Sequence, residues 1–466
     1  MKGESIVLVK DMTKGSPVRL LLTFAIPMLL GSVFQQLYSV VDAMVLGRGV
    51  GVEALAAAGA SGSVHFFIFG FVTGLTHGYS ILIAQRFGAG DHVGVRRVVA
   101  NSGYLGFLSA VVIMTLSLAF SRPLMQLMQT PADIFEDALL YIRITFIGLV
   151  ATVFYNVLGS TLRALGDSIS PLVIVILSSL INVGLDVLFV MVFHWGVAGA
   201  AWATVIAQLC SGFMCLFVLS RMEIMRYKKG EGAMDGKLLW ALLRLGLPVG
   251  IMNSITAVGN MILQVIVNGF GSATVAAYTA GMKIIGLAEQ PGNIIGMSLG
   301  TYVGQNLGAG DLPRVRTGVR KTIVMSLIIN LGIGGALVLF GKQLVEVFVS
   351  GAAQEVIQTA YPLIAICGAM NGVLGLLFVY RFSLQSLGDT FVPMLSGALE
   401  LILRVVTVLV LSKVFHMEFY AVCFAEVSAW VGAAVLLCVT YYIRMHKLIR
   451  EEGALPMHSE SRGVKS

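Results

Sequence analysis

The chain alternates between long apolar stretches and short polar breaks along its whole length. Many of the stretches have about 20 residues, the length at which an α-helix crosses the hydrocarbon core of a bilayer. The pattern predicts twelve transmembrane helices, with approximate cores at residues 20–46, 53–84, 98–120, 137–158, 169–192, 197–220, 238–267, 274–303, 319–340, 356–380, 391–412 and 419–443. The first, second, seventh and eighth stretches are longer than a bilayer requires, so we expect tilted or kinked helices there.

Composition agrees with this pattern. Of the 466 residues, 57% are hydrophobic and 12% are charged. A soluble globular protein has about 25% charged residues, so this chain has too few charges to cover a surface that faces water. The short apolar run Ile6–Val9 is too brief for a signal peptide. We therefore expect an all-α polytopic membrane protein with many spans and no signal peptide.

Basic residues gather in every second break between the predicted helices. Twenty-three of the 31 Lys and Arg residues fall in one alternating set of breaks, in which we include Arg163 and Arg381. The opposite set holds only four, namely Arg48, Arg122, Lys342 and Lys413. The positive-inside rule then predicts cytoplasmic termini and a cytoplasmic central loop. This asymmetry also explains the net charge of +7 without a nucleic-acid partner.

The sequence contains an internal repeat. "AQRFGAGDHVGVRR" (84–97) corresponds to "GQNLGAGDLPRVRT" (304–317), and "LRALGDSISP" (162–171) corresponds to "LQSLGDTFVP" (384–393). Pro27 likewise aligns with Pro248. The nearly constant offset indicates a duplication of six helices, so we expect two six-helix lobes related by a pseudo-two-fold axis along the membrane normal. The predicted divisions are an N-terminal segment at 1–16, an N-lobe at 17–220, a linker at 221–237, a C-lobe at 238–443 and a tail at 444–466.

The repeated Gly-rich loops do not resemble nucleotide-binding loops. They lack the GxGxxG spacing and the lysine of a P-loop, so we expect glycine to end one helix and Asp91 or Asp311 to cap the next. The chain also has no GxSxG, HExxH or CxxC motif. We therefore expect a protein that is not an enzyme, and any active transport would use an ion gradient.

The N-terminal half places acids inside predicted spans, where an Asp at mid-membrane costs about 2.5–3.5 kcal/mol. Asp42 lies late in the first span, Asn182 and Asp186 share one face of the fifth, and Thr204 lies in the sixth. Two carboxylates, an amide and a hydroxyl are hard oxygen ligands that suit Na⁺, and two close acids can instead share a proton. We expect a cation site at these four residues and no other metal site.

The repeat provides an internal control for this hypothesis. The matched positions in the C-terminal half do not keep these four residues. They hold Leu263 for Asp42, Arg404 for Asn182, Val408 for Asp186 and Glu426 for Thr204. The fold therefore does not require the acids, and the asymmetry favours a cation site in the N-lobe alone. The alternative is that the polar residues join helices without binding an ion.

The C-terminal half has its own charges within predicted spans. Glu400 and Arg404 are four residues apart, so we expect them to form a structural ion pair. For Lys283, Glu289 and Glu426 we expect a link to substrate or to protons, the alternative being that Glu289 pairs with Lys283 or Arg404. Pro291 and Gly292 predict a break in the eighth helix beside a water-lined cavity.

The chain resembles the multidrug and toxic compound extrusion (MATE) family over residues 15–445. The resemblance rests on "IPMLLGSVFQQLYSVVDAMVLGRGVGVEALAAAG", "GQNLGAGD", "LRALGD" and the six-plus-six duplication. It implies a V-shaped pair of lobes and alternating access, with entry of Na⁺ or H⁺ driving export of amphipathic, often cationic compounds. In the branch similar to DNA-damage-inducible transporters, the N-lobe cation site matches Asp42, Asn182, Asp186 and Thr204.

Two features separate this chain from related alternatives. Another branch of the family binds its cation through acids in the seventh and tenth helices, and neither helix has one here. A lipid-linked flippase of the same superfamily is the main alternative function, but only Lys283 and Arg404 are clearly basic within spans. We expect small amphipathic substrates, the lipid bilayer as surroundings, a monomer, and no cofactor apart from the coupling ion, with Na⁺ and H⁺ both open.

Overall fold

The computed structural model describes residues 10–348 and 354–454, and all regular secondary structure in these ranges is helical. The N-terminal half contains α1 (Pro17–Gly49), α2 (Val52–Ala60), α3 (Gly62–Gly88), α4 (His92–Leu127), α5 (Phe135–Ile147), α6 (Leu149–Ala164), α7 (Ile169–Asp186), the π-helix η1 (Val187–Val192) and α8 (Gly196–Arg221). The 3₁₀ turn η2 (Glu223–Met225) follows. The C-terminal half contains α9 (Gly236–Asn268), α10 (Ser272–Gly308), α11 (Leu312–Phe348), α12 (Gln354–Ala369), α13 (Asn371–Ser386), α14 (Phe391–Lys413) and α15 (Glu418–Ala454).

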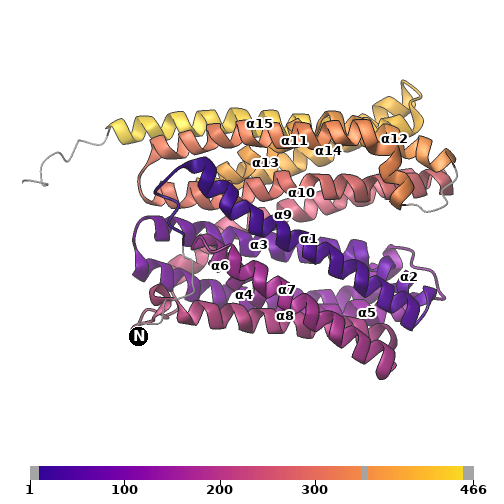
Figure 1. Ribbon diagram of the computed structural model, residues 1–466, viewed down its shortest axis with the longest axis horizontal. Helices are drawn as coiled ribbons and strands as arrows, with labels where there is room; N and C mark the ends of the chain where they lie inside the picture. Colours follow the sequence, from indigo (N-terminus) through magenta and orange to yellow (C-terminus); the bar gives the residue numbers. More distant parts are fainter. Residues whose placement is uncertain (1–9, 349–353, 455–466) are drawn as a thin grey trace, which may run out of the picture.

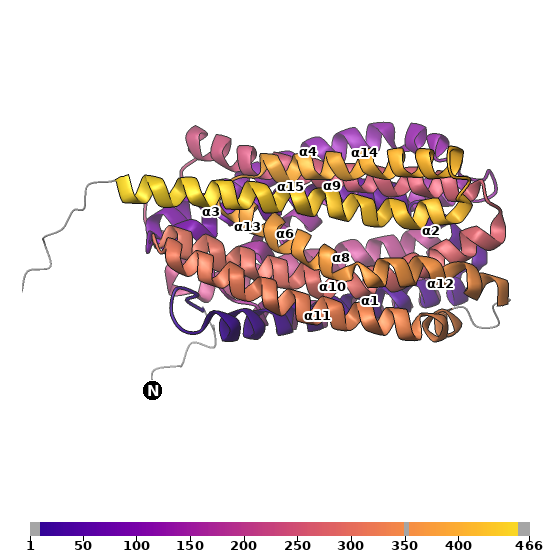
Figure 2. The ribbon, with the colours of Figure 1, turned by 90° about the horizontal axis from the view of Figure 1, so that it is seen from above.

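These helices confirm the predicted membrane architecture. Within the described residues, nine helices are long and apolar enough to span a bilayer. Two further spans are bent pairs, α5 with α6 at 45° and α12 with α13 at 51°. The less apolar α10 has 37 residues and runs beside α11 in both ribbon views (Figures 1 and 2). The protein is thus a multi-pass membrane protein, and the long second span is divided at Ser61 into α2 and α3.

The predicted break at Pro291 and Gly292 is wrong. Both residues lie inside α10, which continues from Ser272 to Gly308. A proline removes one backbone donor, but neighbouring helices in a membrane protein allow the helix to continue. Gly292 instead permits close packing, because a Cβ there would lie 2.9 Å from the side-chain oxygen of Asn330 on α11.

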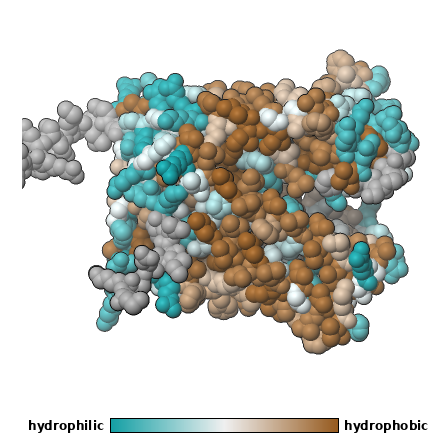
Figure 3. Space-filling view, viewed as in Figure 1, coloured by the Kyte–Doolittle hydropathy of each residue, from teal (hydrophilic) through white to brown (hydrophobic). Residues whose placement is uncertain are grey.

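The two halves form separate lobes that lie side by side. In Figure 1, α2–α8 lie below and α10–α15 lie above, whereas α1 runs diagonally from the upper left to the lower right, and α1 begins at the same end of the bundle at which α15 ends. We call this the basic end, because Arg86, Arg96 and Arg314 lie there. A hydrophobic band covers the middle of the molecule, and the surface is hollowed between the lobes at the opposite end (Figure 3). The predicted terminal segments 1–16 and 444–466 lie partly outside the described residues.

Helices α3 and α9 join the lobes through glycines. A Cβ on Gly78 would overlap the backbone of Gly246, and a Cβ on Gly74 would lie 2.6 Å from the carbonyl oxygen of Val249. Small residues of this kind let two membrane helices approach until their backbones touch. The side chain of Asn253 adds a hydrogen bond to the carbonyl oxygen of Gly70 at 2.9 Å.

At the basic end, two glutamines from equivalent positions of the repeat cross between the lobes. Gln85 donates to the carbonyl oxygen of Ser386 at 2.8 Å, and Gln305 donates to the carbonyl oxygen of Ala164 at 2.9 Å. We call these two reciprocal bonds the glutamine clasp. Gln305 also accepts a bond from the backbone N–H of Met12 at 2.9 Å. The lobes are therefore held together at the basic end and separated at the other.

The loops of the repeat confirm the expected helix caps. Asp91 accepts a hydrogen bond from the backbone N–H of Gly94 at 2.8 Å, and Asp311 accepts one from that of Arg314 at 2.9 Å. Asn, Asp and Ser are favoured at such positions because their side chains satisfy the free N–H groups of the first turn. The Gly-rich loops are accounted for by helix geometry.

The linker between the lobes is attached to the N-lobe along most of its length. Arg96 on α4 holds both carboxylate oxygens of Glu231, with nitrogen–oxygen distances of 2.5 and 2.9 Å. Asn101 accepts a bond from the backbone N–H of Asp235 at 2.8 Å, and Tyr104 donates to the carbonyl oxygen of Gly232 at 2.8 Å. The hydrogen bond from Arg96 lowers the pKa of Glu231 to about 2. The linker is therefore pinned to α4 up to the start of α9.

Candidate functional site

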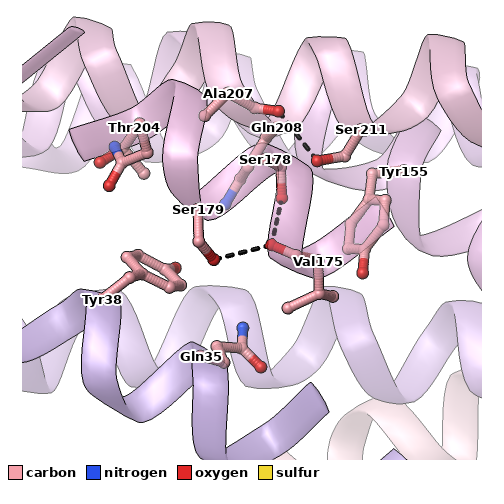
Figure 4. Close-up of a pocket in the computed structure, with 11 residues that line it drawn as sticks. Gln35, Tyr38, Tyr155, Val175, Ser178, Ser179, Thr204, Ala207, Gln208 and Ser211 are labelled. Atoms are coloured by element: carbon pink, nitrogen blue, oxygen red, sulfur yellow. Dashed lines mark hydrogen bonds between the residues drawn. The ribbon is translucent and has the colours of Figure 1, made fainter. Parts of the chain in front are cut away.

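A small polar pocket lies inside the N-lobe, enclosed by α1, α6, α7 and α8 (Figure 4). Its cavity volume is about 50 Å³, enough for an ion with little accompanying water. The lining is mostly hydroxyl, amide and phenol groups, supplied by Gln35, Tyr38, Tyr155, Val175, Ser178, Ser179, Asn182, Thr204, Ala207, Gln208 and Ser211. Figure 4 shows Ser178 and Ser179 of α7 facing Gln35 and Tyr38 of α1 across this space.

The structure brings the four predicted cation-site residues into this region. Asn182 and Thr204 both line the pocket. Asp186 is fully buried on the last turn of α7, and Asp42 of α1 is half-buried. The carboxyl groups of Asp42 and Asp186 are near enough for their charges to interact, although no hydrogen bond joins them. Helices that are distant in sequence therefore place their polar side chains together.

The polar atoms of this group lack protein partners, and this tests whether they fit a cation. Among the described residues, buried atoms without a hydrogen bond include Oδ1 of Asp42, both carboxylate oxygens of Asp186, and the side-chain oxygen and nitrogen of Asn182. Buried polar groups are normally satisfied, because an unmet group costs free energy. All three residues supply oxygen ligands of the kind that Na⁺ prefers, and the carboxyls of Asp42 and Asp186 can alternatively share one proton. The residues thus fit either ion.

Local backbone geometry sets the position of Asp186. The α-helix ends at this residue and continues as the π-helix Val187–Val192. Single π-turns within α-helices are frequent at functional sites, because they shift the side chains that follow. Gly49 at the end of α1 packs against this turn, since a Cβ there would lie 2.9 Å from the side chain of Val190.

Two tyrosines near the acids were not predicted. Tyr38 of α1 and Tyr141 of α5 both lie close enough to Asp42 and Asp186 to interact with their charges. In the sequence each tyrosine stands within an apolar stretch, where an aromatic residue normally indicates core packing. The spacing of Tyr38 and Asp42, four residues apart on one helix, is the only signal that pointed to one of them.

A second cavity lies inside the C-lobe and has a volume of about 240 Å³. It is lined by five ionisable residues, Glu289, Arg381, Glu400, Arg404 and Glu426. Aromatic and amide side chains complete the wall, including Phe66, Phe378, Trp430, Asn260, Gln290 and Asn293. Of the ionisable residues, all but Glu289 are more than nine-tenths buried.

The expected ion pair between Glu400 and Arg404 is wrong. Glu400 pairs with Arg381 of α13, and Arg404 pairs with Glu426 of α15 at 3.0 Å. Spacing along one helix places two side chains on a common face. Here that face packs against α13, which supplies an arginine to Glu400, and against α15, which supplies a glutamate to Arg404. Glu426, which had no evident partner in the sequence, therefore has Arg404 as its partner.

Two basic residues that we assigned to loops lie elsewhere. Arg381 is within α13 and buried beside Glu400, and Arg163 is within α6 and lines the cavity between the lobes. The charge asymmetry of the loops persists without them. Lys283, expected to be linked to substrate or protons, has an exposed side chain on α10 and does not line the C-lobe cavity, whereas Glu289 does.

Two helical lobes, paired by a repeat and enclosing buried charges, define a membrane transporter fold. The MatE family model matches residues 27–188 and 248–410, so the chain belongs to the MatE family. These two segments begin at Pro27 and Pro248, the prolines that the repeat aligns.

Individual relatives agree with this membership. The chain is 30% identical over 371 residues to a Bacillus subtilis protein named "Probable multidrug resistance protein YoeA", covering 76% of this chain and 78% of the relative. It is 28% identical over 386 residues to "Probable multidrug resistance protein YpnP" of the same organism, covering 78% and 83%. The fold resembles a solved MOP superfamily transporter from Pyrococcus furiosus, with a TM-score of 0.89, 23% identity, and coverage of 96% and 100%.

Proposed function

We propose that this protein exports amphipathic, often cationic compounds by alternating access, in exchange for H⁺ or Na⁺. The names of its relatives support drug efflux as the activity. The observation that carries the exchange mechanism is the group of buried, unpartnered polar atoms on Asp42, Asn182 and Asp186. An inward-moving ion would satisfy these atoms, with Thr204 as a further ligand, and would leave again when the lobes rearrange.

A contact between the lobes supports the coupling of ion to movement. Asp42 lies on α1, and Ser32 of the same helix donates to the side-chain oxygen of Gln290 on α10 at 3.2 Å. Neutralising Asp42 and Asp186 removes the repulsion between their carboxylates and lets α1 pack closer to α7. A shift of α1 would change its contact with the C-lobe, so ion binding would alter the balance between the two transporter states.

We assign the basic end to the cytoplasm on the positive-inside rule. With this orientation the glutamine clasp closes the cytoplasmic side, and the space between the lobes faces outward. That state is the one in which an ion would enter the N-lobe pocket from outside and a cargo molecule would be released. The protein would lie in a bacterial-type inner membrane with both termini in the cytoplasm.

The proposal is tested by efflux from proteoliposomes under imposed Na⁺ or pH gradients. Fluorescent organic cations should leave wild-type vesicles in one or both gradients, and Asp42→Asn should abolish gradient-driven efflux. Glu53→Gln is the matched control, because Glu53 is an exposed acid on α2 at the same end of the bundle. Efflux by Asp42→Asn at the wild-type rate would refute the coupling role.

A flippase for lipid-linked precursors is less well supported by the charges. Such cargo carries phosphate groups and requires unpaired basic residues. Both arginines of the C-lobe cavity are paired with acids, and Glu289 is a third acid there, which leaves Arg163 in the cavity between the lobes as the arginine that such cargo could meet. Failure of vesicles to export any organic cation, together with scrambling of a fluorescent polyprenyl phosphate, would favour the flippase.

A further inference from the structure

An apolar groove crosses the junction between the lobes near the basic end. It lies between the start of α1 and the adjacent part of α11, and it has a volume of about 630 Å³. In Figure 2 these two helices lie along the same side of the bundle. Two of its lining residues, Val324 and Ile328, are 57% and 69% exposed, so the groove is open to the surroundings of the protein. The apolar lining consists of Val18 and Leu22 of α1 with Val324, Met325, Ile328 and Ile329 of α11.

The two helices that form the groove belong to different lobes and are packed on each other. Leu21 and Phe24 of α1 are buried in the same hydrophobic cluster as Val319 of α11. The guanidinium of Arg314, also on α11, donates to the carbonyl oxygen of Gly15 at 2.8 Å, just before α1 begins. A molecule that fills the groove therefore contacts both lobes at once.

Two positive charges stand at one end of the groove. Arg320 and Lys321 line the part that is nearest the start of α11 and the basic end. Both side chains are exposed, and none of the ion pairs that the described residues form includes either of them. The groove lining contains no acid. Two adjacent cations without an acidic partner attract an anion.

The length of the groove matches one leaflet of a bilayer. Between residues 320 and 329, α11 rises about 13 Å, and the hydrocarbon core of one leaflet is about 15 Å deep. The charged side chains come first along this path, and apolar side chains follow. A phospholipid has the same order, with its phosphate at the membrane surface and its acyl chains toward the middle. A free phosphate ion would use the two charges alone and would leave the apolar length unoccupied.

We propose that an anionic phospholipid occupies the groove between α1 and α11, with its phosphate on Arg320 and Lys321 and one acyl chain along Val324 and Ile328. Basic pockets between membrane helices on the cytoplasmic side are typical binding sites for anionic headgroups, and the basic end is the one that we assign to the cytoplasm. The bound lipid bridges the lobes at the same end as the glutamine clasp and stabilises closure of that end. The inference does not require the exchange of an ion for cargo.

The test is native mass spectrometry of the purified full-length protein in detergent, titrated with dioleoylphosphatidylglycerol or dioleoylphosphatidylcholine. The two lipids have the same acyl chains and differ in net charge. We expect the first bound phosphatidylglycerol to have a dissociation constant at least about tenfold lower than that of the first phosphatidylcholine. Glycerol phosphate has the charge of a headgroup without the chains, and it should not displace the lipid at equal concentration.

Charge variants test the headgroup contact. Arg320→Gln combined with Lys321→Gln should remove most of the preference for phosphatidylglycerol and leave the affinity for phosphatidylcholine unchanged. Arg226→Gln combined with Lys229→Gln is the matched control, because these exposed linker residues have the same charges at the same end of the molecule. The control pair should keep the preference. Unfolding curves in detergent verify that both variants fold.

Groove variants test the acyl-chain contact. Val324→Trp fills the groove without a change in charge, so it should weaken the binding of phosphatidylglycerol about tenfold. Leu339→Trp is the matched control, because Leu339 is 72% exposed on the same helix and does not line the groove. Equal loss of binding in the two variants would contradict a chain in the groove.

Bridging of the lobes has its own measurement. Spin labels at the exposed positions 93 on α4 and 446 on α15 report the separation of the lobes at the basic end. The labels are placed in Gln305→Ala, which lacks one bond of the glutamine clasp and therefore has a larger open population. Phosphatidylglycerol should reduce the population with the longer distance, and the additional changes Arg320→Gln and Lys321→Gln should remove this effect. An unchanged distance distribution in the lipid-saturated protein would overturn the bridging role.

Three binding results would overturn the lipid site. Equal affinity of the wild type for the two lipids would remove the role of charge. A preference that survives in the folded Arg320→Gln, Lys321→Gln variant, or that is lost equally in the control pair, would place the lipid elsewhere. Displacement by glycerol phosphate would reduce the groove to a site for small anions. Selective lipid binding together with no gradient-driven efflux would leave the lipid site standing and would refute the proposed exchange function alone.

Discussion

Gln85 and Gln305 stand at equivalent positions of the repeat, and each donates a side-chain hydrogen bond to the other lobe. Their acceptors, the carbonyl oxygens of Ser386 and Ala164, are equivalent as well. Each neutral hydrogen bond contributes about 1 kcal/mol, and the two act on the same separation of the lobes. The clasp is thus a symmetric contact that favours closure of the basic end.

Removing the clasp should open the basic end. Each hydrogen bond lost should increase the population with an open basic end about fivefold. Gln305→Ala should therefore have a larger effect than Gln85→Ala, because Gln305 also accepts a hydrogen bond from the backbone of Met12. Spin labels on the exposed positions 93 and 317 would report this as a longer-distance population. The exposed Gln126→Ala is the control, and an unchanged distance distribution in both clasp variants would contradict the role.

The glycine contact between α3 and α9 should be sensitive to one added methyl group. Gly78→Ala places a Cβ into the backbone of Gly246 and should separate the lobes or lower the unfolding temperature in detergent. Gly103→Ala is the control, because a Cβ there meets no atom within 4 Å. The control should be neutral or stabilising by up to about 1 kcal/mol. Equal behaviour of the two variants would contradict close packing at Gly78.

Double-mutant cycles can test the ion pair between Arg404 and Glu426 in the C-lobe. Removing either Arg404 or Glu426 should cost about 3–5 kcal/mol, because the partner remains buried and unpaired. The double variant Arg404→Gln with Glu426→Gln should cost much less than the sum. Chemical unfolding in detergent measures these differences. A stronger coupling of Arg404 to Glu400 than to Glu426 would restore the pairing that the sequence suggested.

The linker contact predicts a dependence on acid pH. Glu231 has a lowered pKa of about 2 in the folded protein, against about 4.3 for a free glutamate. Its contribution to stability is therefore present above about pH 4.3 and is lost as the pH falls toward 2. The difference in unfolding temperature between wild type and Glu231→Gln should be constant near neutral pH and shrink within that range.

Hydrogen exchange provides a second measurement of the same contact. The backbone N–H of Lys228 donates to Glu231 at 2.8 Å, so its exchange at neutral pH should be faster in Glu231→Gln. Glu223→Gln is the matched control, since Glu223 is exposed in the same linker. Faster exchange in the control alone would contradict pinning through Arg96.

Ligands of the proposed ion site should differ in importance. Asn182 is almost fully buried with both polar side-chain atoms unpaired, whereas Thr204 is half-buried. Asn182→Ala should raise the ion concentration for half-maximal efflux about tenfold, and Thr204→Val should raise it by less. Efflux from vesicles over an ion series measures both. Ser220→Ala on α8 is the control, and an effect of Thr204→Val larger than that of Asn182→Ala would contradict this ranking.

The sequence predicted the spans well because hydrophobic length is a local property. It also singled out Asp42, Asn182 and Asp186, because acids and amides are rare inside apolar stretches and therefore conspicuous. The structure places these residues near one another, as the hypothesis required. Their role as ion ligands remains a prediction.

Contacts between helices were harder to predict. Glu400 and Arg404 satisfy a spacing rule within one helix, but the better partners come from α13 and α15, which the sequence does not place beside them. Arg381 was assigned to a loop for a related reason, because hydropathy cannot show that a buried arginine forms an ion pair with Glu400 of another helix. The break predicted at Pro291 is absent because the rule that proline ends a helix does not consider the neighbouring helices that allow α10 to continue.

The glutamine clasp and the two cavities together show what the duplication preserved. Structural contacts survive in both copies, namely the interlobe hydrogen bonds of Gln85 and Gln305 and the helix caps of Asp91 and Asp311. The positions that line the two cavities have diverged, as Arg404 in place of Asn182 illustrates. A gene copied once has therefore kept a symmetric contact between its lobes while the linings of its two cavities diverged, so under the proposed exchange mechanism a change in cargo preference need not disturb the contact that closes the basic end.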